Sequence, residues 1–303
     1  MKRPGKKATE EMKQQYRAAV KQQNLSRRFV DMGRQLRREL DQAGGARKIL
    51  VLAGDGSFCN RTCFADISER TELLVRARRD ARLCLRANDG SRRFYAVEKF
   101  TPEQVRNDEA HGWRTTKIFY GGKLRKIRYK EQSGVYWQRG AKQRPLRLFV
   151  IAPTPYRKNQ GKRLYYRNPA YLFTTDLKCS PRQLLQIYFD RWQIEVNHRE
   201  EKDTLGVGQA QLWNATSVPK QPVLAVAAYS ALLLASLQAF GPQRGTAYTE
   251  LPKWRRNTRR PSCLDLITLL RKEVNTPTAR LQIPRHPNRP KTNDRGCRSL
   301  IKM

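Results

Sequence analysis

The stretch KILVLAGDG, residues 48–56, is a short apolar run that ends in Gly-Asp-Gly. A continuous run of aliphatic residues, bounded by turn-forming residues, is typical of a strand that is buried on both faces. We therefore expect a central strand of an α/β sheet here, with Asp55 directly after its carboxyl end. An aspartate between two glycines is also a common turn residue, so a purely structural role stays open for Asp55.

The segment before this strand predicts one amphipathic helix. Apolar residues recur there at steps of three and four, which is the period of a helix with one buried face. Gly44 and Gly45 would end this helix. Residues 1–24 are polar and basic, and we expect them to be frayed, so that residues 1–48 form a basic lead and an amphipathic helix. The periodic residues are Leu25, Phe29, Met32, Leu36 and Leu40.

Two different patterns follow the central strand. The run ELLVRAR, residues 72–78, predicts a second strand, and residues 49–91 would form the first part of the α/β core. Over residues 92–175, short β-prone runs are separated by Gly, Pro and basic residues. We expect an inserted antiparallel β region of its own there, in which basic and aromatic residues interleave. The runs are FYAVEKF, TKIFY, LRKIRYK, VYWQR, LRLFVIA and YLFTTD.

A long helix is predicted after the β region. Ser180 is a suitable N-cap, Pro181 fits the first helical position, and Gln183 completes a capping-box pattern. Gly206 would end this helix after Leu205. The signals therefore predict one continuous helix from the serine to the leucine.

The remaining chain divides into an apolar part and a basic part. The stretch at 223–240 is strongly apolar, but it contains serine and glutamine, and a membrane span needs about 20 residues. We interpret it as a buried core helix, which together with the preceding helix makes up residues 176–245. Residues 246–303 are rich in Pro, Arg and Asn, with one amphipathic piece, CLDLITLLRKEV, and we expect a basic, partly disordered region there.

The charge of the chain indicates a polyanionic partner. It has 62 Lys and Arg residues against 26 Asp and Glu residues, a formal net charge of +36. The excess runs through the whole chain, as expected for a protein that binds a phosphate backbone over a large area. The alternative explanation is a general basic bias of the proteome.

The cysteines and the amino terminus carry little functional signal. Cys59 and Cys63 are four apart, but no further Cys or His stands at ligand spacing, so the pattern does not predict a zinc site. No apolar stretch follows the basic start of the chain, which predicts no secretory signal and a cytoplasmic location. The other cysteines are Cys84, Cys179, Cys263 and Cys297.

A polar stripe runs along the predicted helix in the stretch YFDRWQIEVNHREEK, residues 188–202. At about 100° per residue, Tyr188, Arg191, Glu195 and Lys202 fall within roughly 60° of one another. The stripe could be solvated, with Glu195 paired to Arg191 and Arg199 for a few tenths of a kcal/mol. It could also be a functional site.

Carboxylates in so basic a chain point to phosphoryl-transfer chemistry. Enzymes that act on nucleic-acid backbones use clustered Asp and Glu residues to hold two divalent cations, which activate a water or a hydroxyl group. Asp55 and Glu195 are the candidates for that role. Arg191 and Lys202 suit the neighbouring phosphates, and Tyr188 could hydrogen-bond a phosphate or stack on a base.

These residues resemble a known family. The DDE-type insertion-sequence transposases have the signature Tyr-x2-Arg-x3-Glu-x6-Lys, which this chain resembles at Tyr188, Arg191, Glu195 and Lys202. The sequence RWQIE at the centre of the signature is typical of that family. LVLAGDGSF is similar to the family's second catalytic Asp strand, and TELLVRARRDARL is similar to the strand that follows. The β-rich stretch resembles the insertion before the family's glutamate helix, so the resemblance covers about residues 49–210.

The resemblance implies a fold, an activity and a set of partners. The fold would be a ribonuclease H-like core with an inserted antiparallel β region, and Asp55 and Glu195 would be the second and third catalytic acids. The activity would be DNA transposition by cleavage and strand transfer with two Mg²⁺ or Mn²⁺ ions, on the terminal inverted repeats of double-stranded DNA. A nucleoid-associated homodimer on paired ends is implied. The implied DNA contacts are Tyr188, Arg191, Arg199, Lys202, Trp113 and Trp137, with core packing an equal alternative for the two tryptophans.

One feature of the family is missing from the pattern. The first acid should follow an earlier strand, yet nothing before residue 25 has a strand pattern, and Asp31 and Asp41 fall within the helix pattern. We hypothesise an N-terminally truncated family member, whose enzymatic activity is then open. In an alternative mapping, Asp55 is the first acid and Asp176 the second.

Three functions are compatible with these observations. The chain could be a DNA transposase, a catalytically incomplete DNA-binding remnant of one, or an unrelated basic nucleic-acid-binding protein. Direct attack of a hydroxyl on DNA needs no covalent enzyme intermediate, which agrees with the lack of a nucleophile motif in the sequence.

Overall fold

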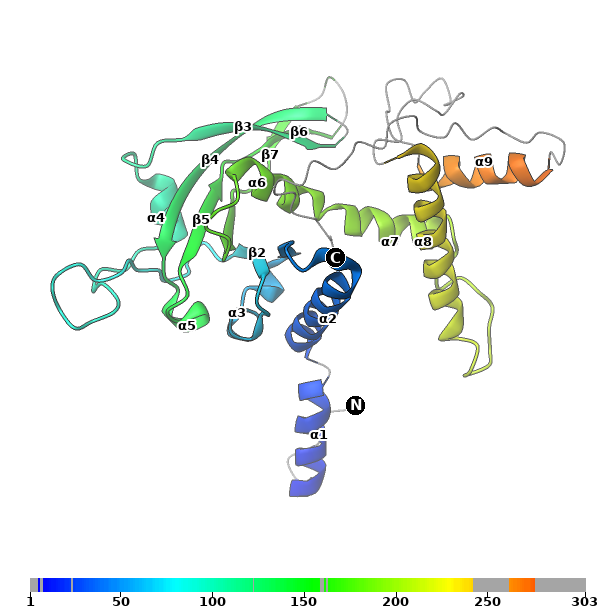
Figure 1. Ribbon diagram of the computed structural model, residues 1–303, viewed down its shortest axis with the longest axis horizontal. Coiled ribbons are helices and arrows are strands. Elements are labelled where there is room, and N and C mark those ends of the chain that lie inside the picture. The colour runs from blue at the N-terminus through cyan, green and yellow to red at the C-terminus, as the bar shows by residue number, and fades with distance from the viewer. Residues whose placement is uncertain are drawn as a thin grey trace. The chain divides into compact units, whose positions relative to one another are not determined.

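A computed structural model describes most of the chain (Figure 1). The described residues up to Arg191 form one compact unit, and those from Trp192 onward form another. Cys297 and most of the expected basic C-terminal region lie outside the described residues. The described residues are 5, 8–22, 24–121, 123–158, 161, 163–241 and 262–275.

The first unit is built on one mixed six-stranded sheet with the strand order β1-β2-β8-β5-β4-β3. The two strands expected around residues 48–56 and 72–78 are both present and pair in parallel, from Leu50↔Thr71 to Gly54↔Val75. Every residue of β1 is buried, as the apolar run predicts. The expected central position is wrong, because β1 stands at one end of the strand order and pairs with β2 alone among the described strands. The chain therefore has a mixed α/β fold. The strands are β1 (Leu50–Gly54), β2 (Thr71–Ala77), β3 (Arg114–Tyr120), β4 (Lys123–Val135), β5 (Leu146–Ile151) and β8 (Ala170–Thr174).

The β-rich stretch is antiparallel as predicted, but it is not a separate region. Strand β8 pairs with β2 from Leu74↔Thr174 to Ala77↔Tyr171 and pairs with β5 on its other side. This pairing joins the inserted strands to β1 and β2 in one continuous sheet, so the expectation of a region of its own is wrong. Two short strands, β6 (Pro155–Arg157) and β7 (Leu164–Tyr166), form a separate hairpin.

Two helices precede the sheet. The predicted amphipathic helix is present as α2 (Leu25–Leu40), and the Asn24 side chain caps it by accepting hydrogen bonds from two backbone N–H groups at 2.9 and 3.3 Å. The expectation of a frayed start is wrong for α1 (Glu10–Gln22). Its acidic first turn favours the helix dipole, and its Lys, Gln and Ala residues are good helix formers.

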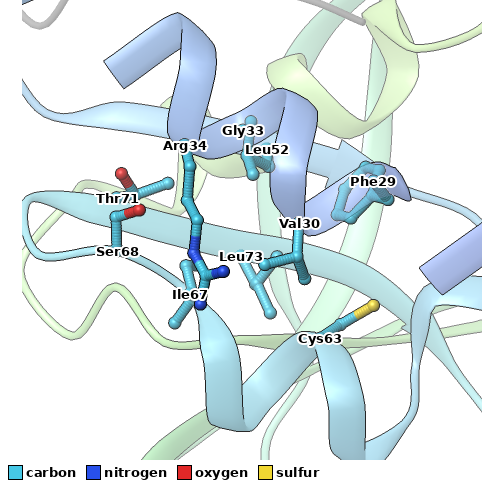
Figure 2. A pocket seen from close by; sticks show the side chains of 10 residues that line it. All are labelled: Phe29, Val30, Gly33, Arg34, Leu52, Cys63, Ile67, Ser68, Thr71 and Leu73. Carbon is cyan, nitrogen blue, oxygen red and sulfur yellow. The ribbon is translucent and has the colours of Figure 1, made fainter. Parts of the chain in front are cut away.

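Helix α2 packs closely on one face of the sheet (Figure 2). Gly33 is required at the crossing point, because a Cβ atom there would lie 2.5 Å from Cδ1 of Leu52. Phe29, Val30 and Leu73 line the same seam, which has no room for a water molecule. This hollow is therefore a feature of core packing. The connections of this unit contain four further short elements. They are the π-helical turn η1 (Asp41–Gly45), α3 (Arg61–Asp66), α4 (Pro102–Asn107) and α5 (Gln138–Ala141).

The opposite face of the sheet is covered by α6 (Pro181–Asp190). Its buried residues, Leu184, Leu185 and Ile187, belong to the same apolar cluster as Phe149 of the sheet. Ser180 caps the helix by accepting a hydrogen bond from the Gln183 backbone N–H at 3.3 Å, which confirms the predicted start.

The predicted single helix after Ser180 is two helices, so this prediction is wrong. Turn residues Arg191 and Trp192 separate α6 from α7 (Gln193–Asp203). Both turn residues keep right-handed helical dihedral angles, and neither is proline or glycine. The sequence therefore carries no conventional marker for the interruption.

The second unit contains α7, α8 (Lys220–Phe240) and α9 (Cys263–Asn275). The prediction that the apolar stretch is a buried core helix is wrong. Of the residues of α8, only Tyr229 and Ser236 are buried, and Leu224 is 72% exposed. The reason is that α7 and α9 are the described helices that pack on α8, and together they cover only part of it. By length and composition alone, α8 is the one described helix that could cross a membrane.

Candidate functional site beside Asp55

Asp55 lies where the sequence predicts, directly after the buried strand β1. It is exposed, and its Oδ1 accepts a hydrogen bond from the backbone N–H of Ser57 at 2.8 Å. This bond caps the short 3-10 helix η2 (Gly56–Phe58). The turn role is therefore confirmed, and it engages one carboxylate oxygen while the side chain still faces solvent.

A hollow of about 460 Å³ opens beside this carboxylate. Its lining comes from the end of β1, the end of β2 and the end of α6, all within the first unit. Three arginines and one tyrosine converge there with one aspartate. The lining side chains are those of Asp55, Ser57, Arg76, Arg78, Tyr188 and Arg191, and Gly56 and Ala77 complete the wall.

The strand register explains why Arg76 and Arg78 face Asp55. Because β1 and β2 are parallel and Gly54 pairs with Val75, the next residues along both strands, Asp55 and Arg76, lie side by side. Arg78 forms a two-pronged ion pair with Asp80 at 2.9 and 2.7 Å, whose hydrogen bonds lower the pKa of the Asp80 carboxyl. The sequence analysis missed both arginines, although the run VRAR at the end of a parallel strand was the available signal.

Tyr188 and Arg191 reach the hollow from the end of α6. The Tyr188 ring packs edge-on against Phe189, with centroids 5.8 Å apart, and borders the apolar cluster beneath the helix. The Phe189 ring in turn stacks on Tyr120 of β3, with centroids 4.7 Å apart, which fixes the helix end against the sheet. The structure thereby brings the first two residues of the Tyr-Arg-Glu-Lys signature together with Asp55.

The hollow has the composition of an anion site. Arg76 and Arg191 bring two guanidinium groups to the lining, and forked N–H donors match phosphate or carboxylate oxygens. The fork of Arg78 is engaged by Asp80. A magnesium site needs several oxygen ligands, and the lining offers the single carboxylate of Asp55. Among the residues that the structure describes, no group of three or more His, Cys, Asp and Glu side chains could hold a metal ion. The lining alone thus fits a phosphate and not Mg²⁺ or Mn²⁺.

The second half of the signature lies in the other unit, on α7. Glu195, Arg199 and Lys202 are all exposed, and their spacing of four and three places them on one face of that helix. The opposite face of α7 packs on α8, where the Tyr229 hydroxyl group reaches Asn197 at 3.0 Å and Glu200 at 2.8 Å. Packing on α8 therefore leaves the signature face of α7 open.

Asp176 is placed away from Asp55. It is 3% exposed, and its Oδ1 accepts hydrogen bonds from the backbone N–H groups of Lys178 and Cys179 at 2.8 and 2.7 Å. Because β8 runs antiparallel to β2, Asp176 lies level with Glu72, four residues along the strand from Arg76. That offset is about 13 Å at 3.3 Å per residue. Ions of a two-metal site are about 4 Å apart, so the structure separates the two acids of the alternative mapping.

The two tryptophans have different surroundings. Trp137 packs in the core, with its ring centroid 5.8 Å from that of Phe64 and 5.7 Å from that of Phe173. Trp113 is half-buried, with Nζ of Lys130 4.9 Å from its ring centroid, and it borders a second hollow of about 350 Å³. The placement of Trp137 agrees with the core-packing interpretation, whereas Trp113 keeps an accessible edge.

No protein-family model matches the chain, and no curated protein matches it. The resemblance to transposases therefore rests on the residues themselves and on where the fold places them.

Proposed function

We propose that this chain is a DNA-binding protein of insertion-sequence transposition, and that the hollow beside Asp55 holds a phosphate of the DNA backbone. One observation carries the proposal: Asp55, Tyr188 and Arg191 come from distant parts of the sequence and line the same hollow. The spacing of Tyr188 and Arg191 follows the family signature, and Asp55 follows the strand that the signature's family places in its core.

The charges around the hollow support a phosphate ligand. Arg78 is paired with Asp80, but Arg76 and Arg191 still exceed the single negative charge of Asp55, and the whole chain carries +36. Such a field attracts DNA from a distance, and each neutralised phosphate releases counterions, so affinity should fall steeply with salt. Duplex DNA with the element's terminal inverted repeats is the proposed substrate, and we expect the protein with the cell's DNA in the cytoplasm.

Strand cleavage and joining are proposed for Asp55 together with Glu195, the two acids that the resemblance assigns to catalysis. A Mg²⁺- or Mn²⁺-dependent reaction needs more carboxylates than the hollow supplies. A specific observation therefore favours a second candidate, a DNA-binding remnant without catalysis: the lining of the hollow supplies the single carboxylate of Asp55.

A cleavage assay separates the two candidates. The probe is duplex DNA covering the ends of the gene's own flanking sequence, incubated with the protein and Mg²⁺ or Mn²⁺. Cleavage that is lost in Asp55→Asn and in Glu195→Gln, while DNA binding persists, supports the transposase. Binding without cleavage supports the remnant, and a chain that neither binds nor cleaves DNA contradicts both. Arg17→Gln on α1 is the control variant, because Arg17 is exposed and outside the hollow.

A further inference from the structure

The β6–β7 hairpin forms a two-stranded sheet of its own, outside the six-stranded sheet (Figure 1). The Arg167 backbone N–H donates to the Thr154 carbonyl at 3.0 Å and extends the pairing by one step. No acidic residue occurs in residues 152–175, whereas five basic residues lie within or beside the hairpin. A two-stranded hairpin is marginally stable by itself, so contacts between its own side chains must contribute.

One face of the hairpin, which we call the tyrosine face, combines two tyrosines with three cations. Tyr156 and Tyr165 are direct cross-strand partners, with ring centroids 5.7 Å apart. Strand alternation puts Lys158, Arg163 and Arg167 on the same face. Their charged groups lie 5.3, 5.9 and 5.6 Å from the tyrosine ring centroids, respectively.

Both sides of the hairpin meet solvent. The face opposite the tyrosine face carries Arg157, Leu164 and Tyr166, and Tyr166 is 62% exposed. On the tyrosine face, Tyr156 and Tyr165 are half-buried, so part of each ring is accessible to a ligand. The ligand of such a surface must be negatively charged and must offer flat groups to the two rings.

We propose that the tyrosine face binds single-stranded nucleic acid. Unpaired bases would stack on Tyr156 and Tyr165, while Lys158, Arg163 and Arg167 contact the phosphates on either side. Duplex bases do not offer their faces to a side chain, so the aromatic part of the site selects unpaired nucleotides. The inference rests on the proposed nucleic-acid-binding function, but none of its five residues lines the hollow beside Asp55.

The test measures binding of the full chain to fluorescent oligo-dT and to a duplex of equal length. Replacing both rings, in Tyr156→Ala/Tyr165→Ala, should weaken oligo-dT binding by tenfold or more and duplex binding by about twofold at most. Tyr156→Phe/Tyr165→Phe keeps both ring faces and should bind like the unmodified chain. Equal losses on both probes, or a Phe variant as weak as the Ala variant, would overturn the proposal.

A charge series checks the phosphate contacts without touching the rings. The double variant Arg163→Gln/Arg167→Gln should make the slope of log oligo-dT affinity against log salt shallower by about 1.4. This is the value for two phosphate contacts on a single strand. Arg157→Gln and Leu164→Ala, on the opposite face, are matched controls and should leave oligo-dT binding unchanged. If Arg157→Gln reduces the salt slope as much as each arginine of the tyrosine face does, the assignment is contradicted.

Two further arms separate the possible sources of failure. Oligo-U beside oligo-dT distinguishes an RNA ligand from a DNA ligand, since the proposed stacking is common to both. If the tyrosine variants bind oligo-dT normally while Arg191→Gln weakens duplex binding, the hairpin proposal fails and the proposed function stands. If the unmodified chain binds neither probe, both fail.

Discussion

Asp55 and Asp176 both follow a strand of the same sheet, yet the structure uses them in different ways. Asp176 is buried and its Oδ1 accepts two backbone N–H groups, so it holds the turn between β8 and α6. Asp55 is exposed, accepts one backbone N–H, and faces a hollow with three arginines. A position directly after a strand therefore does not by itself distinguish a structural carboxylate from a candidate functional one. The burial of the side chain and the residues around it make the distinction.

The largest expected effect is on the structural side of this comparison. Asp176→Ala should lower the free energy of unfolding by about 2–4 kcal/mol, because the buried Cys179 N–H and the partly buried Lys178 N–H lose their acceptor. Asp55→Ala removes only an exposed cap and should cost about 1 kcal/mol or less. Denaturant unfolding followed by tryptophan fluorescence measures both variants. Similar losses in the two variants would remove the distinction between the two aspartates.

The second expected effect concerns the strand that leads to Asp176. Tyr171 of β8 is buried and its hydroxyl group donates to the Glu103 carboxylate, and burial together with this partner raises the pKa of Tyr171 to about 12. The folded state thus holds the phenol proton more tightly than the unfolded state, whose tyrosine pKa is about 10. The contribution to stability is present below pH 10 and is lost as the pH rises through about 12.

Tyr171→Phe should therefore cost about 1–2 kcal/mol at neutral pH. The variant should also lose less stability than the unmodified chain between pH 10 and 12. Urea titrations across that range measure the difference. A variant whose stability falls with pH as steeply as that of the unmodified chain would refute the role of the Tyr171 hydroxyl group.

The smallest expected effect is on the functional side of the comparison. Asp55→Asn keeps a side-chain oxygen for the Ser57 N–H but removes a negative charge beside three arginines. Duplex DNA affinity should rise, by about two- to fivefold, because a nearby carboxylate repels a phosphate and one pair in water-exposed surroundings is worth about 1 kcal/mol or less. Fluorescence anisotropy measures the change. The equivalent neutralisation Asp31→Asn, at an exposed position of α2, is the control, and an equal gain there would show that only net charge matters.

Part of this arrangement could be predicted from sequence. The apolar run of β1, the helical period of α2 and the cap at Ser180 are local signals, and each is confirmed. The break at Arg191 and Trp192 was missed because both residues keep helical dihedral angles and no proline or glycine marks it. The continuity of the sheet was missed because the pairing of β8 with β2 joins residues about one hundred positions apart, which no local pattern encodes.

The exposed helix α8 and the arginines of the hollow show two other limits. Apolar composition predicts burial only when enough structure surrounds a helix, and for α8 the described partners, α7 and α9, are few. Arg76 and Arg78 could have been predicted, because parallel strands place their carboxyl ends at one edge and VRAR stands at the end of the second strand. The metal site expected from the resemblance cannot be derived from the lining of the hollow, which has one carboxylate.

The salt dependence of duplex DNA affinity tests the central claim most directly. For Arg191→Gln, we predict a slope of log affinity against log salt that is reduced by about 0.9, the value for one phosphate contact on B-form DNA. Arg17→Gln, an exposed arginine on α1 outside the hollow, should leave the slope unchanged. Equal slopes for Arg191→Gln and the unmodified chain would contradict the claim that the hollow beside Asp55 holds a phosphate of DNA.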